Sequence, residues 1–185
     1  ETDGGMAAQA EIAPIDQNNP DEVVSFAKEK GINLVVIGPE APLVVGVADA
    51  VRQAGIACFG PNQNAAQMEG SKAFAKGVME RANVPTAAWK SFTDQTSCEA
   101  YVRHIGAPVV VKADGLAAGK GVIVATELEH ALEGVRECFS GHFGDAGATV
   151  VVEEFLEGPE CSLLALTDGT YVCLLYTSDA ADEGL

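Results

Sequence analysis

The 185-residue sequence has few basic residues: 11 Lys and Arg stand against 27 Asp and Glu, which gives a formal net charge of −16. A general nucleic-acid binder neutralises phosphates with a basic patch, so this composition excludes nucleic acid as an expected partner. An excess of acidic residues is ordinarily found on a solvated surface. A few well-placed lysines and backbone amides could still bind a small anion in such a chain.

The sequence also lacks an apolar run long enough to cross a membrane, so no membrane partner is expected. Its five cysteines contain no Cys-x-x-Cys pair, which excludes the usual zinc and thioredoxin-like patterns. Their number is odd and no signal peptide precedes them. We therefore expect reduced, mostly buried thiols in a cytoplasmic protein. The chain begins with Glu1 rather than Met, from which we expect the start of the protein to be missing.

Hydrophobic residues make up 48% of the sequence, enough for a compact α/β protein. A helix is predicted from Asn19-Pro20 to Gly31, because Asn caps helices well and Pro suits the first helical position. Residues 32–37 are nearly all apolar and predict a buried parallel strand. A helix over 43–54 and a strand over 56–59 follow. This alternation predicts part of a doubly wound parallel sheet over residues 1–70.

A second region is predicted over residues 71–175, beginning with a helix over 71–82 that Ser71 caps. Asp168-Gly169 is typical of a hairpin turn. The further helices are predicted over 95–105 and 127–140, and the strands over 89–92, 108–112, 121–125, 150–152, 162–166 and 171–175. Residues 176–185 are small, polar and acidic, and we interpret them as a disordered or artefactual tail.

The strongest local pattern is a strand that ends in Lys112 and continues through a glycine-rich loop containing Lys120 into another strand. Glycines let the backbone approach a phosphate closely, exposed N–H groups can bind an anion, and lysines add positive charge. The pattern differs from the P-loop, which opens into a helix, and from the dinucleotide-binding Gly-x-Gly-x-x-Gly. The alternative is a glycine-rich hairpin with surface lysines.

Two further segments could belong to a binding site. An apolar strand runs into a carboxylate cluster at 153–160, where backbone groups could contact an adenine and a carboxylate could hold ribose hydroxyls. The alternative is a solvated acidic turn. The loop over 38–43 follows a predicted parallel strand, and open α/β sheets bind ligands at the carboxyl ends of their strands. There the alternative is a rigid proline turn.

The histidines carry no comparable pattern. His104, His130 and His142 have no metal-ligand spacing and are predicted to be surface or structural residues. Trp89 is most simply a core aromatic residue. No Ser/His/Asp or Cys/His arrangement can be argued, so the sequence assigns no catalytic residue.

These segments together, in this order and at these spacings, resemble the phosphoribosylamine–glycine ligases, an ATP-grasp family of purine biosynthesis. The resemblance extends over residues 1–175, and the ordered set is far more specific than any one motif. The matching segments are Gly-Pro-Glu-Ala-Pro-Leu (38–43), Phe-Gly-Pro (59–61), Glu-Gly-Ser-Lys-Ala-Phe (69–74), Val-Lys-Ala-Asp-Gly-Leu-Ala-Ala-Gly-Lys-Gly-Val (111–122), Phe-Gly-Asp-Ala-Gly (143–147) and Glu-Glu-Phe-Leu-Glu-Gly (153–158).

The resemblance implies ATP-dependent ligation of glycine to 5-phosphoribosylamine through a glycyl phosphate, giving glycinamide ribonucleotide, ADP and phosphate. It also implies contacts of Lys72 and Lys112 with the ATP phosphates, and binding of Mg²⁺ or Mn²⁺ by the C-terminal half of such enzymes. The remaining implied residues are a phosphate lid (Gly115, Leu116, Ala117, Ala118, Gly119, Lys120, Gly121), an adenine hinge (Glu153, Glu154, Leu156), a ribose ligand (Glu160) and a phosphoribosylamine loop (Gly38, Pro39, Glu40, Pro42).

The resemblance further implies that this chain is a fragment, because it lacks the family's opening strand and its C-terminal half with the metal ligands. We expect no glycinamide ribonucleotide from the chain alone. The alternatives are another ATP-grasp carboxylate–amine ligase and a non-catalytic nucleotide-binding fragment. A partial domain leaves apolar surface uncovered, so we expect marginal stability or aggregation.

Overall fold

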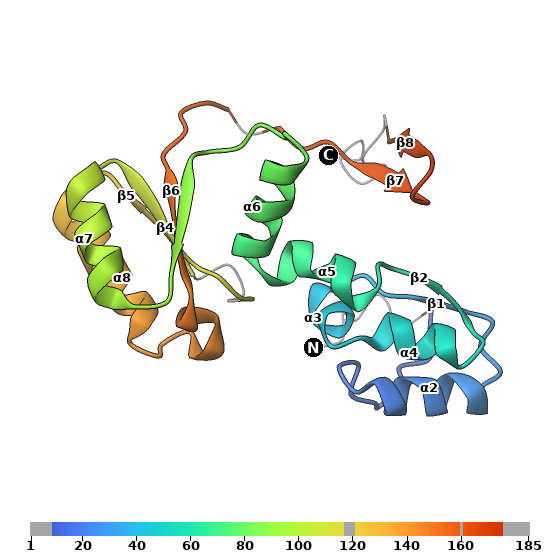
Figure 1. Ribbon diagram of the computed structural model, residues 1–185. Coiled ribbons are helices and arrows are strands. Elements are labelled where there is room, and N and C mark those ends of the chain that lie inside the picture. Colours follow the sequence, from blue (N-terminus) through green and yellow to red (C-terminus); the bar gives the residue numbers. More distant parts are fainter. Residues whose placement is uncertain (1–8, 117–120, 160, 176–185) are drawn as a thin grey trace. The chain divides into compact units, whose positions relative to one another are not determined.

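The structure, a computed structural model, describes residues 9–116, 121–159 and 161–175 (Figure 1). Contacts divide the chain into two units, Glu1–Phe155 and Leu156–Leu185, and each is described by itself. Within the described ranges, no helix is both long enough and apolar enough to cross a membrane.

The first part of the larger unit contains a two-stranded parallel sheet with helices between and beside its strands. Its elements are α2 (Pro20–Glu29), β1 (Leu34–Val36), α3 (Glu40–Val44), α4 (Val47–Gln53), β2 (Ala57–Phe59) and α5 (Gln63–Gly70). The start of α2 is fixed by Asn19, whose side-chain oxygen accepts hydrogen bonds from the N–H groups of Asp21 and Glu22. Parallel strands joined through helices confirm the predicted doubly wound pattern.

Two predictions for this part are wrong in detail, and one helix was missed. The expected buried strand is short, and its outer face is open, with Leu34 56% and Val36 65% exposed. Gly46 adopts a positive φ of 90° and divides the predicted single helix into α3 and α4. Helix α5 was not predicted, because only its Asn62 cap and a run of small and polar residues mark it in the sequence.

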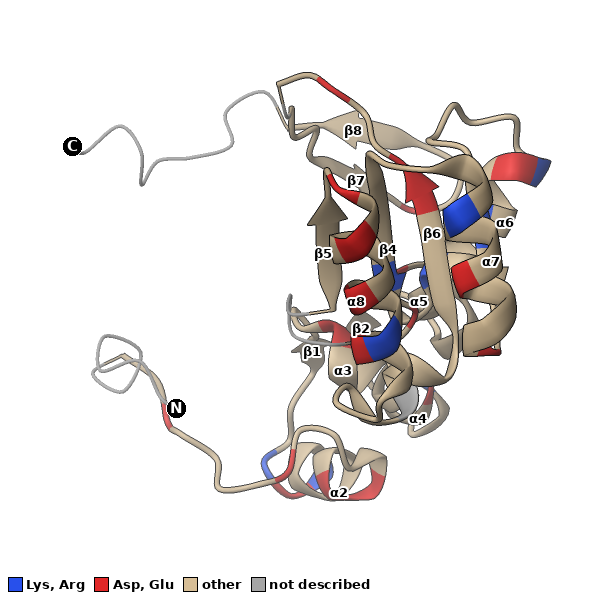
Figure 2. Ribbon diagram, turned by 90° about the vertical axis from the view of Figure 1, so that its left-hand side faces the viewer, with Lys and Arg blue, Asp and Glu red and all other residues tan. Residues whose placement is uncertain are grey.

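The second part of the larger unit is an antiparallel sheet of four strands in the order β3-β6-β4-β5. Figures 1 and 2 show α7 and α8 on one face of this sheet and α6 on the other. The elements are α6 (Lys72–Arg81), β3 (Trp89–Phe92), α7 (Gln95–Ile105), β4 (Val109–Ala113), β5 (Val122–Ala125), α8 (Leu128–Phe139), the 3-10 helix η1 (Gly144–Ala148) and β6 (Val150–Glu154).

The main core lies between this sheet and the pair α7 and α8. Val111 and Val152 are buried beside Leu132 and Val135 of α8. Because side chains alternate along a strand, the neighbours of Val111 in β4 and of Val152 in β6 point to the opposite face, toward α6. The predicted limits of β3 and α7 are confirmed, and Ser71 caps α6 as predicted by accepting from the Phe74 N–H. Trp89 is only partly buried, so the core position expected for it is wrong.

The smaller unit contains a hairpin of β7 (Ala165–Thr167) and β8 (Val172–Leu174), which turns at the predicted Asp168-Gly169. Gly169 has a positive φ of 89°, which glycine adopts without a steric penalty. The first strand, predicted over 162–166, spans Ala165–Thr167 and so lies closer to the turn than predicted. The predicted tail over 176–185 lies outside the described residues.

The cysteines only partly match expectation. All five are free, and Cys98 and Cys138 are fully buried in the main core. Cys161 and Cys173 of the smaller unit are exposed, so the expectation of mostly buried thiols is wrong for that hairpin region.

Candidate functional site

The pairing of β4 with β6 places two charged side chains on the sheet face that looks toward α6. Val110 pairs with Glu153 and Lys112 with Val151, so Lys112 and Glu153 belong to the same set of alternating positions. The other set, which includes Val111 and Val152, forms the core with α8. The same valine-rich strands therefore carry a core face and a charged face.

The carboxylate of Glu153 lies between two ammonium groups. Its Oε2 is 2.9 Å from Nζ of Lys76 on α6, and its Oε1 is 3.0 Å from Nζ of Lys112 on β4. Glu153 is 5% exposed and Lys76 8%, and Lys76 also donates to Thr86 Oγ1 at 2.7 Å. A charge this deeply buried is tolerated because opposite charges and hydrogen bonds compensate for its lost hydration.

Asp114 attaches the end of β4 to the start of α6. Its Oδ2 accepts from the Ser71 hydroxyl at 2.9 Å, and its Oδ1 accepts from the Ala73 N–H at 2.6 Å. Its backbone oxygen accepts from the Lys72 N–H at 3.2 Å. A carboxylate at a helix N-terminus is stabilised by the free N–H groups there. The two elements that carry the lysines are thereby fixed to one another.

Lys72 begins α6 and points to the start of the glycine-rich loop. Its Nζ donates to the backbone oxygens of Asp114 at 3.3 Å and of Gly115 at 3.0 Å. Burial lowers the pKa of Lys72; the carboxylate of Asp114 opposes this change, and the ammonium of Lys112 adds to it. An anion that approaches Lys72 would stabilise its charged form.

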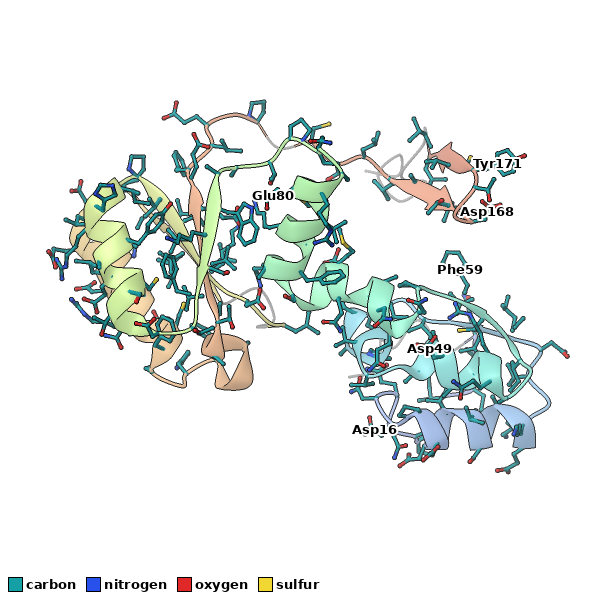
Figure 3. All side chains as sticks on the ribbon, viewed as in Figure 1. Asp16, Asp49, Phe59, Glu80, Asp168 and Tyr171 are labelled. Carbon is teal, nitrogen blue, oxygen red and sulfur yellow. The ribbon has the colours of Figure 1, made fainter. Side chains whose placement is uncertain are left out.

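The three lysines and Glu153 line a cleft of about 350 Å³ on the α6 side of the sheet. Figure 3 shows side chains of α6 and of the sheet extending into the space between them. The charged residues of the lining are Glu40, Glu69, Lys72, Lys76, Lys112 and Glu153, and the others are Met68, Ala75, Met79, Gly115, Leu116, Gly121 and Val122. Lysines that converge on a strand end and a glycine-rich loop provide a site for phosphate groups.

Comparison with known proteins shows the family of the chain. The family model described as the phosphoribosylglycinamide synthetase N domain matches residues 1–69, and that of the ATP-grasp (A) domain matches residues 70–181. The chain belongs to the phosphoribosylglycinamide synthetase family. The cleft lies within the region that the ATP-grasp model matches, apart from Glu40, Met68 and Glu69.

Curated relatives agree with the membership of this family. Phosphoribosylamine–glycine ligase of Brucella melitensis is 56% identical over 165 residues, which are 89% of this chain and 39% of that protein. The protein of the same name from Vibrio parahaemolyticus is 54% identical over 174 residues, 94% of this chain and 41% of that protein. The chain thus spans about 40% of the length of these relatives.

A solved structure shows the same fold. The crystal structure of phosphoribosylamine–glycine ligase from Thermotoga maritima is 26% identical and superposes with a TM-score of 0.74. The match covers 94% of this chain and 41% of that one. The expected combination of a partial doubly wound domain and the first part of an ATP-grasp domain is confirmed.

Within this family member, the structure brings together several of the residues that the sequence singled out. Glu40, Lys72, Lys112, Gly115, Leu116, Gly121 and Glu153 all line the cleft. Glu153 is buried and ion-paired, so the alternative of a solvated acidic turn is wrong for this residue. Ala117, Ala118, Gly119, Lys120 and Glu160 lie outside the described residues.

Other predicted residues lie elsewhere. Glu154 is exposed, and its Oε2 accepts from the Ala88 N–H at 3.2 Å. Leu156 belongs to the smaller unit and is 63% exposed. The predicted loop over 38–43 is largely helical, since α3 starts at Glu40 with Pro42 buried inside it. A proline is tolerated in the first helical turn because the N–H groups there have no partner within the helix.

Gly38 and Glu40 line a second cavity of about 490 Å³. Its other lining residues are Leu43, Pro61, Ala65, Ala66, Met68 and Glu69, so Glu40, Met68 and Glu69 are shared with the first cleft. The two cavities therefore adjoin along the end of α5 and the start of α3.

The sequence reasoning missed Lys76 and Asp114. Lys76 follows Lys72 by one helical turn, a spacing that places both side chains on one face of α6 and could have pointed to it. Asp114 follows Lys112 by two positions, but its link to Ser71 spans 43 residues and leaves no local signal. Over the described ranges, no group of three His, Cys, Asp or Glu residues is placed to hold a metal ion. The three histidines are exposed there, as predicted.

Proposed function

We propose that the chain carries the phosphate-binding part of the nucleotide site of an ATP-dependent carboxylate–amine ligase. The observation that supports this most is the convergence of Lys72, Lys76 and Lys112 on one cleft, in which Glu153 forms ion pairs with Lys76 and Lys112. Phosphoryl transfer depends mainly on holding the phosphates and stabilising their charge. Lys72 and Lys112 would contact the phosphates of ATP, and the loop 115–121 would cover them.

For the complete ligase we propose ligation of glycine to 5-phosphoribosylamine, giving glycinamide ribonucleotide, ADP and phosphate through a glycyl phosphate. The names and the 56% and 54% identities of the relatives support this assignment. Residues 1–70 would belong to the substrate-binding domain and residues 71–175 to the ATP-grasp domain. The cavity at Gly38 and Glu40 would take phosphoribosylamine, since it adjoins the phosphate cleft.

The adenine end of the nucleotide is assigned to Glu153, Glu154 and Leu156, with Glu160 at the ribose. Both oxygens of Glu153 already bind lysines, so its contact with adenine would come from the backbone. A divalent cation, Mg²⁺ or Mn²⁺, would neutralise phosphate charge when bound. Among the described residues, no cluster of three His, Cys, Asp or Glu residues is placed to hold it, so we place its ligands outside them.

A calorimetric titration of the full chain with Mg-ATP tests the nucleotide site, with NAD as the control ligand. We expect binding of Mg-ATP and not of NAD, and an affinity about tenfold lower in Lys112→Ala, the equivalent of ~1.4 kcal/mol. Lys28→Ala, on the exposed surface of α2, removes the same charge far from the cleft and should leave the affinity unchanged. Equal binding of NAD, or no loss in Lys112→Ala, would refute the assignment.

A second candidate is a fragment that binds nucleotide without turnover. It is favoured by the lack of a metal-binding group among the described residues and by the 39% and 41% coverage of the relatives. An assay with ATP, glycine and 5-phosphoribosylamine distinguishes the two, and we expect no glycinamide ribonucleotide from this chain. Turnover with a different carboxylic acid would instead indicate another ATP-grasp ligase.

A further inference from the structure

Lys76 is the most enclosed lysine of the cleft and has two partners. It is 8% exposed, and its ammonium binds Glu153 Oε2 at 2.9 Å and Thr86 Oγ1 at 2.7 Å. Two of its three N–H donors are therefore occupied by protein groups. Although it shares a helix face with Lys72, its ammonium is engaged by β6 and by the segment before β3.

The side chain of Lys112 is less enclosed than that of Lys76. Its side chain is 25% exposed, against 10% for that of Lys76, and its ammonium bonds to the other oxygen of Glu153 at 3.0 Å. A lysine side chain has many rotamers, and fixing it in one position costs conformational entropy. Glu153 supplies the fixed point for Lys112, while Lys112 retains donors that can face a phosphate.

We propose that Lys76 is a positioning residue: by holding one oxygen of Glu153, it leaves the other to set the Lys112 ammonium where a nucleotide phosphate binds. This inference rests on the proposed nucleotide site. Without Lys76, the Glu153 carboxylate could turn both oxygens toward Lys112 and draw its ammonium away from the cleft. Lys76 therefore affects phosphate binding without touching the phosphate.

Few other charged residues lie near the group formed by Lys76, Glu153 and Lys112. Lys72 comes from the start of α6 and Asp114 from the end of β4, while Glu40 and Glu69 line the cleft from the first part of the unit. Among the described residues, none of them forms an ion pair with Lys76 or Lys112. Glu153 is thus the link through which a change at Lys76 would reach Lys112.

A double-mutant cycle on the full chain tests this link. Mg-ATP affinity is measured by calorimetry for the parent chain, Lys76→Met, Lys112→Met and the double variant. We expect Lys76→Met to weaken binding about tenfold but to have no further effect, within about twofold, once Lys112 is Met. Lys28→Met is the matched control, since it removes one exposed charge outside the cleft and should change nothing.

The inference is overturned if the fold-losses in Mg-ATP affinity of the two single variants multiply in the double variant. Lys76 would then contact the nucleotide itself or act independently of Lys112. An unchanged affinity in Lys76→Met would overturn it as well. Circular dichroism and thermal unfolding identify a variant that fails to fold. In that case Glu153→Gln replaces Lys76→Met in the cycle, since it keeps the side-chain shape and should show the same lack of effect when Lys112 is Met.

A nucleotide-free measurement separates this inference from the proposed function. In the chain labelled with ¹⁵N-lysine, the ammonium signal of Lys112 is identified by its loss in Lys112→Met. We expect Lys76→Met to move that signal and Lys28→Met to leave it in place. If the parent chain binds no Mg-ATP, the proposed function fails, and the Lys112 signal then tests only the positioning of the Lys112 ammonium by Lys76. A signal that stays in place in Lys76→Met refutes that positioning.

Discussion

The close approach of Gly115 to η1 makes the start of the glycine-rich loop sensitive to one methyl group. A Cβ atom at Gly115 would lie 2.9 Å from both Cα and Cβ of Ala146. Carbon atoms normally approach to about 3.5–4.0 Å. Gly115 does not have a positive φ, so Gly115→Ala adds this clash without backbone strain of its own. The two backbones must therefore separate by roughly 0.5–1 Å.

The expected cost follows from what this separation disturbs. Overpacking of a well-packed site typically costs about 1–3 kcal/mol of stability. The Gly115 N–H, which donates to Ala146 O at 3.4 Å, would move further away. The Gly115 carbonyl, which accepts from Lys72 Nζ at 3.0 Å, would move with it. Loss of one such hydrogen bond is worth about 1 kcal/mol, so we expect Mg-ATP affinity to fall roughly fivefold.

Chemical denaturation and calorimetric titration measure the two effects. Gly77→Ala in α6 is the control, since its added Cβ meets only the tip of Arg81 at 3.4 Å and a helix gains about 1 kcal/mol from this change. Adding Ala146→Gly to Gly115→Ala should restore part of the stability, because the clash with the Ala146 methyl group disappears while the clash with the backbone of residue 146 persists. A Gly115→Ala variant as stable as the parent would refute the reasoning.

Three further predictions concern charge, thiols and packing. Burial lowers the pKa of Lys72, and a bound phosphate should raise that pKa again. Calorimetry in buffers of different ionisation heat should therefore show proton uptake on binding at a pH between the lowered pKa and 10.5, and no uptake in Lys72→Met. Proton release on binding would contradict this prediction. Burial raises the pKa of Cys98 from 9.0 to about 12, so the contribution of its neutral thiol to stability is present below pH 9 and is lost as the pH rises from 9 toward 12. A thiol reagent should modify exposed Cys161 at once and Cys98 only on unfolding. Leu132→Ala, at 0% exposure, should cost about 3–5 kcal/mol by denaturation, whereas Leu34→Ala, at 56%, should cost under about 1 kcal/mol, and equal losses would show that the outer face of β1 is covered.

The fold was predictable where local signals and tertiary packing agree. Asn19 and Ser71 accept hydrogen bonds at the starts of α2 and α6, and both caps were predicted from the sequence. The alternation of buried and partly exposed residues in β4 could not be predicted in the same way, since five successive positions are mostly Val. Burial on one face or the other depends on α8 and α6, which the local sequence does not encode.

The sequence singled out Lys72, Lys112 and the glycine-rich loop, and the structure brings both lysines and the ends of that loop to one cleft, but the partners of these residues were not predictable. Lys72 and Lys112 are separated by 40 positions, and only the fold brings them to one cleft. Glu153 belonged to a cluster of acidic residues that resembles an exposed turn, and its burial depends on the register of β6 against β4. A pattern of residue types indicates a ligand class, whereas the partners of each charge are decided by strand register.

The net charge of −16 and the proposed phosphate site are compatible because they act over different distances. The repulsion between an acidic surface and a nucleotide is screened over about 8 Å at physiological ionic strength. The lysines of the cleft act at hydrogen-bonding distance, where enclosure strengthens each interaction. Within the described ranges, Glu153 is the one carboxylate that forms ion pairs with two of these lysines. For the proposed phosphate site, the position of this buried carboxylate therefore matters more than the many acidic residues on the surface.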